Sequence, residues 1–176
     1  MKTAAITMFA LALPALAQIT VQGSLVKHWK TSGEFTVAVA EAMPAADYNF
    51  RPAPAEMSFG ELMAHIAGVN QNACAFASGF VKPALPPKIA AWAKDTEKVE
   101  VDKETAIAFL RDTFAFCEKA AASMNAVRLD TPVGPASRRM TGFEWLWAYF
   151  THTAHHRGQA EVYLRLKGIK PPDYEF

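Results

Sequence analysis

The chain has 176 residues, of which 51% are hydrophobic, and this is enough to form one domain with a substantial core. It contains no internal repeat and no low-complexity tract, which excludes the solenoid and fibrous classes. Lys and Arg total 18 against 17 Asp and Glu, and the basic residues are scattered. The charge therefore gives no indication of nucleic acid or an anionic membrane surface as a partner.

The first 17 residues predict a secretory signal peptide. Lys2 gives a positive start, residues 4–13 form a short apolar run, and Ala-Leu-Ala at 15–17 matches a cleavage site. The alternative, a membrane anchor, is disfavoured because a spanning helix needs about 20 apolar residues. We expect cleavage after Ala17, a mature domain over residues 18–176, and an exported protein, periplasmic or secreted, with no membrane contact after cleavage.

The first predicted helix runs from Gly23 to Met43 and ends before Pro44. An extended connection over 47–56 follows, because Pro52 and its neighbouring proline do not fit a helix interior. The buried stripe of this helix, with spacings of three and four residues, is predicted to be Leu25, Trp29, Ser32, Thr36, Val39 and Met43.

The second helix is predicted to begin after Ser58, a good N-cap residue, and Glu61 completes a capping box. It runs to about Phe80, where a proline-rich stretch breaks it. Residues 89–101 then form a connector, with a short helical turn near 90–94.

The third helix is predicted to begin after Asp102. The fourth begins at the N-cap Thr141, with Glu144 in a second capping box, and ends before Gly168. The apolar seam of the third helix is predicted to be Ile107, Leu110, Phe114, Cys117, Ala121 and Met124.

These four segments predict an all-α fold, an antiparallel four-helix bundle with a long connection between helices two and three. Four long helices in one short chain favour an up-down order. The connection between the second and third helices is long enough to cross one end of the bundle.

Two histidines of the fourth helix are spaced to bind one metal ion. His152 and His156 lie one turn apart on one face, whereas His155 points away from both. An isolated pair of this kind is modest evidence, because surface histidines recur at this spacing by chance.

His65 in the second helix completes the predicted ligand set. It falls within an apolar stripe formed by Leu62, His65, Val69, Asn72 and Phe76. A buried imidazole needs a polar partner, and alone it would be interpreted as a hydrogen-bonded core histidine. Together with the pair on the fourth helix, His65 predicts one divalent transition metal ion, Zn, Ni or Fe, held by three imidazoles with open positions for water or substrate.

Four side chains near the predicted ligands are candidates to orient the imidazoles or to line a pocket beside the metal site. Gln159 and Glu61 are placed to orient an imidazole, although Glu61 is expected mainly to cap its own helix. Tyr149 and Tyr163 are candidates to line a pocket, and helix packing would explain them equally well. No acid–base carboxylate is evident, and the catalytic residues stay unassigned.

Cys74 and Cys117 are the two cysteines of the chain. Export would permit a disulfide. Because Cys74 falls on the helix face opposite His65, whereas Cys117 falls on an apolar seam, the sequence favours two unpaired thiols and leaves pairing open.

The motifs of helices two and four resemble the DinB-like superfamily of four-helix bundles, which includes the YfiT-type metal-dependent hydrolases. The resemblance rests on the segments 58–65 (SFGELMAH), 152–159 (HTAHHRGQ) and 163–168 (YLRLKG), with a Pro pair after them. It implies metal ligands at His65, His152 and His156. The signal peptide departs from the family pattern and puts a role in cytosolic thiol metabolism in doubt.

Three functions are consistent with these features. The first is hydrolysis of a small substrate through a metal-bound water, which ranks first because an exported protein always has water available. The second is transfer of a thiol activated by the metal. The third is a non-enzymatic metal- or ligand-binding envelope protein.

The partner is expected to be a small molecule. A homodimer is a weaker expectation, based on the aromatic residues at the start of the fourth helix, 143–150. Burial inside one bundle would explain these aromatics almost as well.

Overall fold

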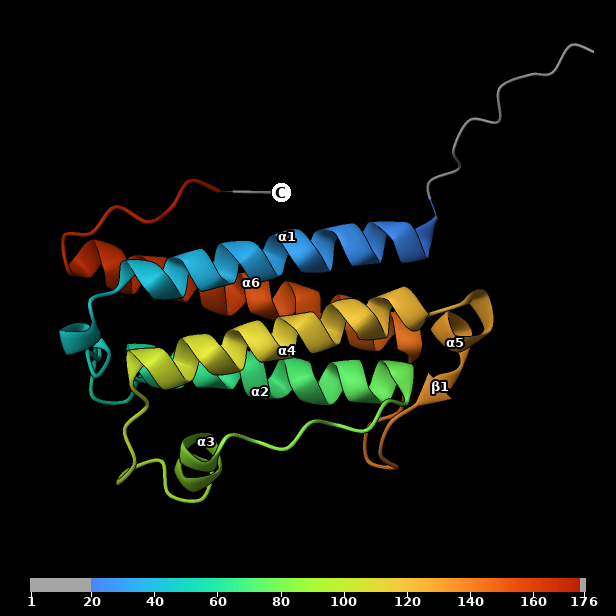
Figure 1. The fold of residues 1–176 in the computed structure, drawn as a ribbon, viewed down its shortest axis with the longest axis horizontal. Coiled ribbons are helices and arrows are strands. Elements are labelled where there is room, and N and C mark those ends of the chain that lie inside the picture. Colours follow the sequence, from blue (N-terminus) through green and yellow to red (C-terminus); the bar gives the residue numbers. More distant parts are fainter. Residues whose placement is uncertain (1–19, 175–176) are drawn as a thin grey trace, which may run out of the picture.

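The computed structural model describes residues 20–174, so the predicted signal peptide lies outside the described residues. Four long helices pack as a bundle, which confirms the predicted fold class (Figure 1). They are α1 (Val21–Ala42), α2 (Phe59–Ser78), α4 (Lys103–Ser123) and α6 (Gly142–Leu166). No helix among the described residues is long and apolar enough to cross a membrane.

The four helices form a square in which α1 and α2 lie diagonally opposite, and each contacts both α4 and α6. The neighbours α1 and α4 run in opposite directions, as do α2 and α6 (Figure 1). The neighbours α2 and α4 run in the same direction, because the long connection returns the chain along the bundle before α4 begins (Figure 1). The simple up-down order expected from the sequence therefore holds for two of the four neighbouring pairs.

Three of the four long helices begin at the predicted residues, whereas α1 begins two residues before the predicted Gly23, after the N-cap Thr20. The hydroxyl of Ser58 accepts from the backbone N–H of Glu61 at the start of α2, and Thr141 and Glu144 form the same capping box at α6. Asp102 caps α4. These caps fix where α2 and α6 begin, and with them the positions of the histidines along both helices.

Several short elements fill the connections. The helical turn predicted near 90–94 is found slightly earlier, as α3 at Pro87–Trp92, because Pro87 is suited to the first turn of a helix. Not predicted from the sequence are a 3-10 turn (Ala45–Asp47), α5 (Ala126–Asp130) and the two-residue strands β1 (Pro132–Val133) and β2 (Met140–Thr141), which pair antiparallel.

The buried stripes predicted for α1 and α4 are confirmed, since all their members are buried. The stripe predicted for α2 is wrong: Asn72 is exposed and His65 is only half-buried. The buried face of α2 instead contains many small residues, including Ala64, Ala67 and Ala73, which let α4 and α6 approach closely. Alanine contributes little to a hydrophobic pattern, and for that reason the pattern pointed to the wrong face.

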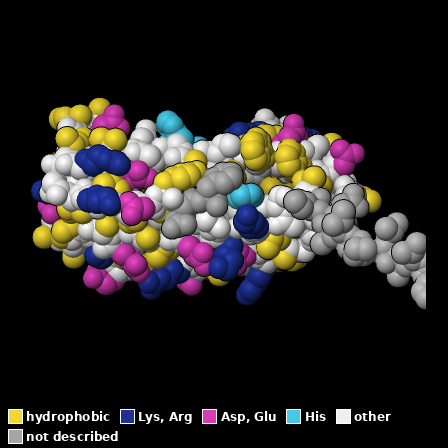
Figure 2. Space-filling model, turned by 90° about the horizontal axis from the view of Figure 1, so that it is seen from above, with side chains coloured by type: hydrophobic (Ala, Val, Ile, Leu, Met, Phe, Trp, Pro, Cys, Tyr) yellow, Lys and Arg dark blue, Asp and Glu magenta, His cyan; other side chains and the backbone are white. Residues whose placement is uncertain are grey.

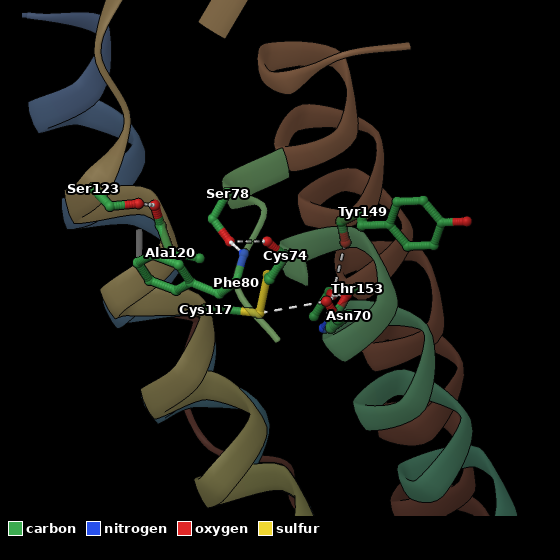
Figure 3. Close-up of a disulfide and its surroundings, with 9 residues drawn as sticks. All are labelled: Asn70, Cys74, Ser78, Phe80, Cys117, Ala120, Ser123, Tyr149 and Thr153. Atoms are coloured by element: carbon green, nitrogen blue, oxygen red, sulfur yellow. Dashed lines mark hydrogen bonds between the residues drawn. A yellow bond between two sulfur atoms is a disulfide. The ribbon is translucent and has the colours of Figure 1, made fainter. Parts of the chain in front are cut away.

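The expectation of unpaired thiols is also wrong. Cys74 of α2 and Cys117 of α4 form a disulfide, with a Cα–Cα distance of 5.3 Å (Figure 3). Because the face opposite His65 is the one that packs on α4, both cysteines are fully buried in the same contact. The Sγ of Cys117 also lies 3.5 Å from the carbonyl oxygen of Asn70, a close contact without a hydrogen, since a disulfide sulfur carries none.

Candidate metal centre

The antiparallel contact of α2 and α6 brings His65, His152 and His156 together. One ring nitrogen of each lies within 4.8 Å of the others. The ring centre of His65 lies 5.2 Å from that of His152 and 4.7 Å from that of His156. The ring centres of His152 and His156 are 4.3 Å apart. All three side chains are half-buried, so the cluster lies at the edge of the helix contact rather than in the core.

The environment keeps the three imidazoles neutral. Burial, together with the neighbouring histidines, lowers the pKa of His152 to about 4. Burial is also the main cause of the lowered pKa of His65 and of His156. A neutral imidazole offers a lone pair, and at neutral pH the cluster therefore presents three nitrogen donors.

The tautomer of His156 is fixed by Gln159, whose Oε1 lies 2.6 Å from the Nδ1. With the proton on Nδ1, the lone pair of Nε2 is free and points at the Nε2 of His152, 3.0 Å away. Two such lone pairs repel unless a proton or a cation lies between them, and a metal ion satisfies both. The donor set fits a transition metal ion.

His152 is held differently from His156. Its Nδ1 is buried and has no hydrogen-bond partner among residues 20–174, so no side chain fixes its tautomer. In a neutral imidazole that binds a metal through Nε2, this Nδ1 carries the proton. His152 therefore lacks the support that Gln159 gives to His156.

Of the other residues considered from the sequence, some flank the histidine cluster and others belong to contacts elsewhere. The ring of Tyr149 lies 5.5 Å from that of His152 and flanks the cluster. Tyr163 is buried and donates to the carbonyl oxygen of Met57, so it belongs to the packing of the bundle. Glu61 caps α2 and pairs with Arg51 at 2.6 Å. His155 is exposed on the outer face of α6.

Two buried polar contacts hold α6 in register with its neighbours. The Asn70 side-chain amide donates to the hydroxyl of Thr153 at 2.8 Å, and this pair lies next to the disulfide (Figure 3). The guanidinium of Arg157, which is 4% exposed, donates to the hydroxyl of Ser32 at 2.9 Å. Of these residues, only the burial of Ser32 was predicted from the sequence; polar side chains at core positions were the available signal for the contacts themselves.

A pocket of about 570 Å³ adjoins the cluster on the side of His65. The connection between α2 and α4 covers it with Trp92 and Glu97, and the segment before α2 adds Arg51 and Glu56. A small molecule could reach the His65 side of the cluster here, so the centre lies beside a space that accepts a ligand.

The fold and the site define a class of protein: a four-helix bundle in which three histidines from two antiparallel helices could hold a metal ion. The DinB superfamily model matches residues 28–160, and the chain belongs to this superfamily. Comparison with curated proteins finds no match.

Solved structures of low sequence identity share the fold. A DinB-like protein from Bacillus cereus is 20% identical over 88% of this chain and 97% of its own, with a TM-score of 0.69. A DinB-like protein from Bacillus subtilis is 22% identical over 86% and 98%, with a TM-score of 0.65. YfiT from Bacillus subtilis, described as a probable metal-dependent hydrolase with an unusual four-helix bundle topology, is 13% identical over 90% and 95%, with a TM-score of 0.66.

Proposed function

We propose that this chain is an exported metal-dependent hydrolase acting on a small substrate, with one divalent ion held by His65, His152 and His156. The observation that carries the proposal is the convergence of three neutral imidazole nitrogens within 4.8 Å, from two helices. The description of YfiT as a probable metal-dependent hydrolase supports it.

The residues of the chain have distinct roles in this proposal. His65, His152 and His156 hold the ion, and Gln159 orients His156. Bound there, the ion supplies Lewis acidity and hydroxide at neutral pH, because three ligands leave positions open. The pocket beside His65 leaves room next to the centre for the uncharged, reacting part of the substrate. No acid–base carboxylate contacts the imidazoles among the described residues, so proton transfer is left to solvent in this proposal.

Export is supported by the disulfide between Cys74 and Cys117, because disulfides persist in oxidising compartments such as the periplasm. We propose that the signal peptide is removed after Ala17. N-terminal sequencing of the protein from a periplasmic or secreted fraction should start at Gln18; the intact Met1 start would contradict export.

The oxidising compartment disfavours the thiol-transfer alternative, which needs a supply of reduced thiol. A non-enzymatic binding protein would use the same three histidines. Thiol transfer would consume an added thiol, and a binding protein would turn over no substrate. An activity screen therefore separates both alternatives from hydrolysis.

The metal site is tested first by elemental analysis of untagged protein. We expect about one divalent ion per chain in the wild type and nearly none in His152→Ala/His156→Ala. The control is His155→Ala, which removes an exposed histidine from the same helix and should retain the ion. Equal metal content in the double variant and the wild type would contradict the assignment.

Hydrolysis is then tested on the metal-loaded protein with panels of small esters and amides. Activity should be present in the wild type, absent in His156→Ala and retained in His155→Ala. Turnover only with added thiol would favour thiol transfer, and retention of the metal without any turnover would favour the binding protein.

A further inference from the structure

Arg138 lies on an aromatic ladder that leads along α6 to the histidine cluster. Trp145 and Tyr149 stack at 5.7 Å, and the Tyr149 ring lies 5.5 Å from His152. The guanidinium carbon of Arg138 lies 5.5 Å from the centre of the Trp145 ring and 5.7 Å from that of Tyr149. Its Nη1 also donates to the Tyr149 hydroxyl at 3.2 Å. An exposed arginine is thus held beside the cluster by two rings.

The loop that carries Arg138 is anchored to the same ladder. The indole N–H of Trp145 donates to the carbonyl oxygen of Val133 at 3.1 Å. Gly134 has φ +100, and a Cβ there would lie 2.8 Å from the Trp145 ring, so only glycine fits this close approach. The backbone N–H of Arg138 donates to the carbonyl oxygen of Pro135. The backbone under Arg138 is therefore fixed.

Arg138 has no acidic partner in the part of the chain that the structure describes, since no carboxylate lies within 4 Å of its guanidinium nitrogens. Arg51, on the opposite side of the cluster, is paired with Glu61. Stacking occupies the face of a guanidinium and leaves most of its N–H donors free at the edge. The free edge of Arg138 is suited to a planar oxyanion.

The electrostatics around the cluster favour an anion on the Arg138 side. Three neutral imidazoles leave the full charge of a bound divalent ion uncompensated. Arg138 adds a positive charge beside the cluster, because its guanidinium lies over the Tyr149 ring and that ring lies 5.5 Å from the ring of His152. On the other side, Glu56 and Glu97 line the pocket beside His65 and would repel an anion.

We propose that Arg138 is a specificity residue that binds an oxyanion, in its simplest form a carboxylate, of the small molecule whose reacting group lies at the three-histidine centre. This inference rests on the proposed metal-dependent function and names its substrate class as anionic. The aromatic rings of Trp145 and Tyr149 hold the guanidinium in place for this contact.

The test uses untagged protein loaded with Co(II), whose visible absorption changes when a ligand binds to the ion. The probes are the half-hydroxamates of succinic, glutaric and adipic acids, each compared with the neutral analogue that has a carboxamide in place of the carboxylate. The hydroxamate binds the ion, and the three chain lengths place the far carboxylate at three different distances from it.

For the wild type we expect the acid of the best-fitting length to bind about tenfold or more tightly than its carboxamide, because a hydrogen bond to a charged group contributes that much. Arg138→Gln should remove this preference and leave carboxamide binding unchanged. The matched control is Arg139→Gln: Arg139 is the adjacent arginine, it donates to the carbonyl oxygen of Pro132 at 2.9 Å, and its loss should leave the preference intact.

Failure of this inference and failure of the proposed function are distinguishable. Co(II) and probe binding without a preference for the acids, or a preference that survives in Arg138→Gln, would overturn the role of Arg138 alone. A wild type that binds no Co(II) would overturn the metal centre and this inference with it.

Discussion

The protonation of single imidazoles decides whether the cluster is able to bind a metal. His152 lies between other positive or titratable groups, including His156 and Arg138, and burial disfavours its charged form further. In the unfolded chain the imidazole of His152 has the ordinary histidine pKa of 6.5. Folding therefore releases a proton from His152 when the pH lies between about 4 and 6.5.

The stability of the metal-free protein should consequently depend on this residue in acid. The pKa of His152 is about 4 in the folded chain and 6.5 in the unfolded chain. The neutral imidazole therefore contributes its full stability above pH 6.5, and this contribution is lost as the pH falls toward 4. We expect the melting temperature, measured with a chelator, to fall more steeply over this window in the wild type than in His152→Gln. Parallel curves for the two proteins would contradict the lowered pKa; carboxylate titration affects both and cancels in the comparison.

At the scale of the elements, the parallel pair α2 and α4 is joined covalently as well as by packing. The disulfide lies near the carboxyl ends of both helices, and Asn70, one turn away, connects α2 to Thr153 on α6 (Figure 3). Tyr149 also lies near this contact, but its side chain points away from the disulfide (Figure 3). The crosslink thus supports the helix that carries His65 on the face away from the metal site.

Removing the crosslink should cost stability without removing the metal site. The two cysteines are 43 residues apart in the sequence, and closing a loop of this length contributes about 4 kcal/mol in the chain-entropy model. We expect Cys74→Ala/Cys117→Ala to lower the free energy of unfolding in urea by roughly this amount and to retain its bound metal. Reduction of the wild type should have a similar effect on stability. An unchanged urea midpoint in both cases would show that the crosslink does not form or does not matter.

At the scale of the whole molecule, the surface is uneven. Figure 2 shows charged and hydrophobic side chains interspersed over the visible face. Exposed apolar side chains lie side by side where the start of α1 meets the start of α6. Val21, Phe143 and Trp147 are 55%, 37% and 53% exposed there. The Trp147 ring stacks on that of Phe143 at 6.2 Å and lines a pocket of about 510 Å³ with α1. Exposed aromatic surface of this kind is typical of an interface.

We propose that this α1–α6 face pairs with a second copy of the chain, as the apolar start of the fourth helix led us to expect. Trp147→Glu should convert a dimer to a monomer, because it introduces a charge into an apolar contact. Val162→Glu is the control, since Val162 is 51% exposed on the same helix and far along it from this face. Light scattering at high concentration measures the mass; a monomeric wild type would contradict the proposal.

The sequence alone determined the parts of this protein that depend on local rules. The caps at Ser58, Asp102 and Thr141 fix where helices begin because an N-cap satisfies backbone groups of its own first turn. The spacing of His152 and His156 fixes that they share a face, since four residues are about one helical turn. These relations hold whatever the helices pack against.

Only the tertiary structure decided which helix faces meet. The small residues of α2 make a close contact with α4 that a hydrophobic pattern does not reveal, and this contact pairs Cys74 with Cys117 and moves His65 to the edge of the bundle. The loop between β1 and β2 precedes α6 almost directly, but only its folding back over the start of the helix sets Arg138 over Tyr149. Contacts between segments distant in sequence depend on the shapes of both partners, and no periodicity within one segment contains that information.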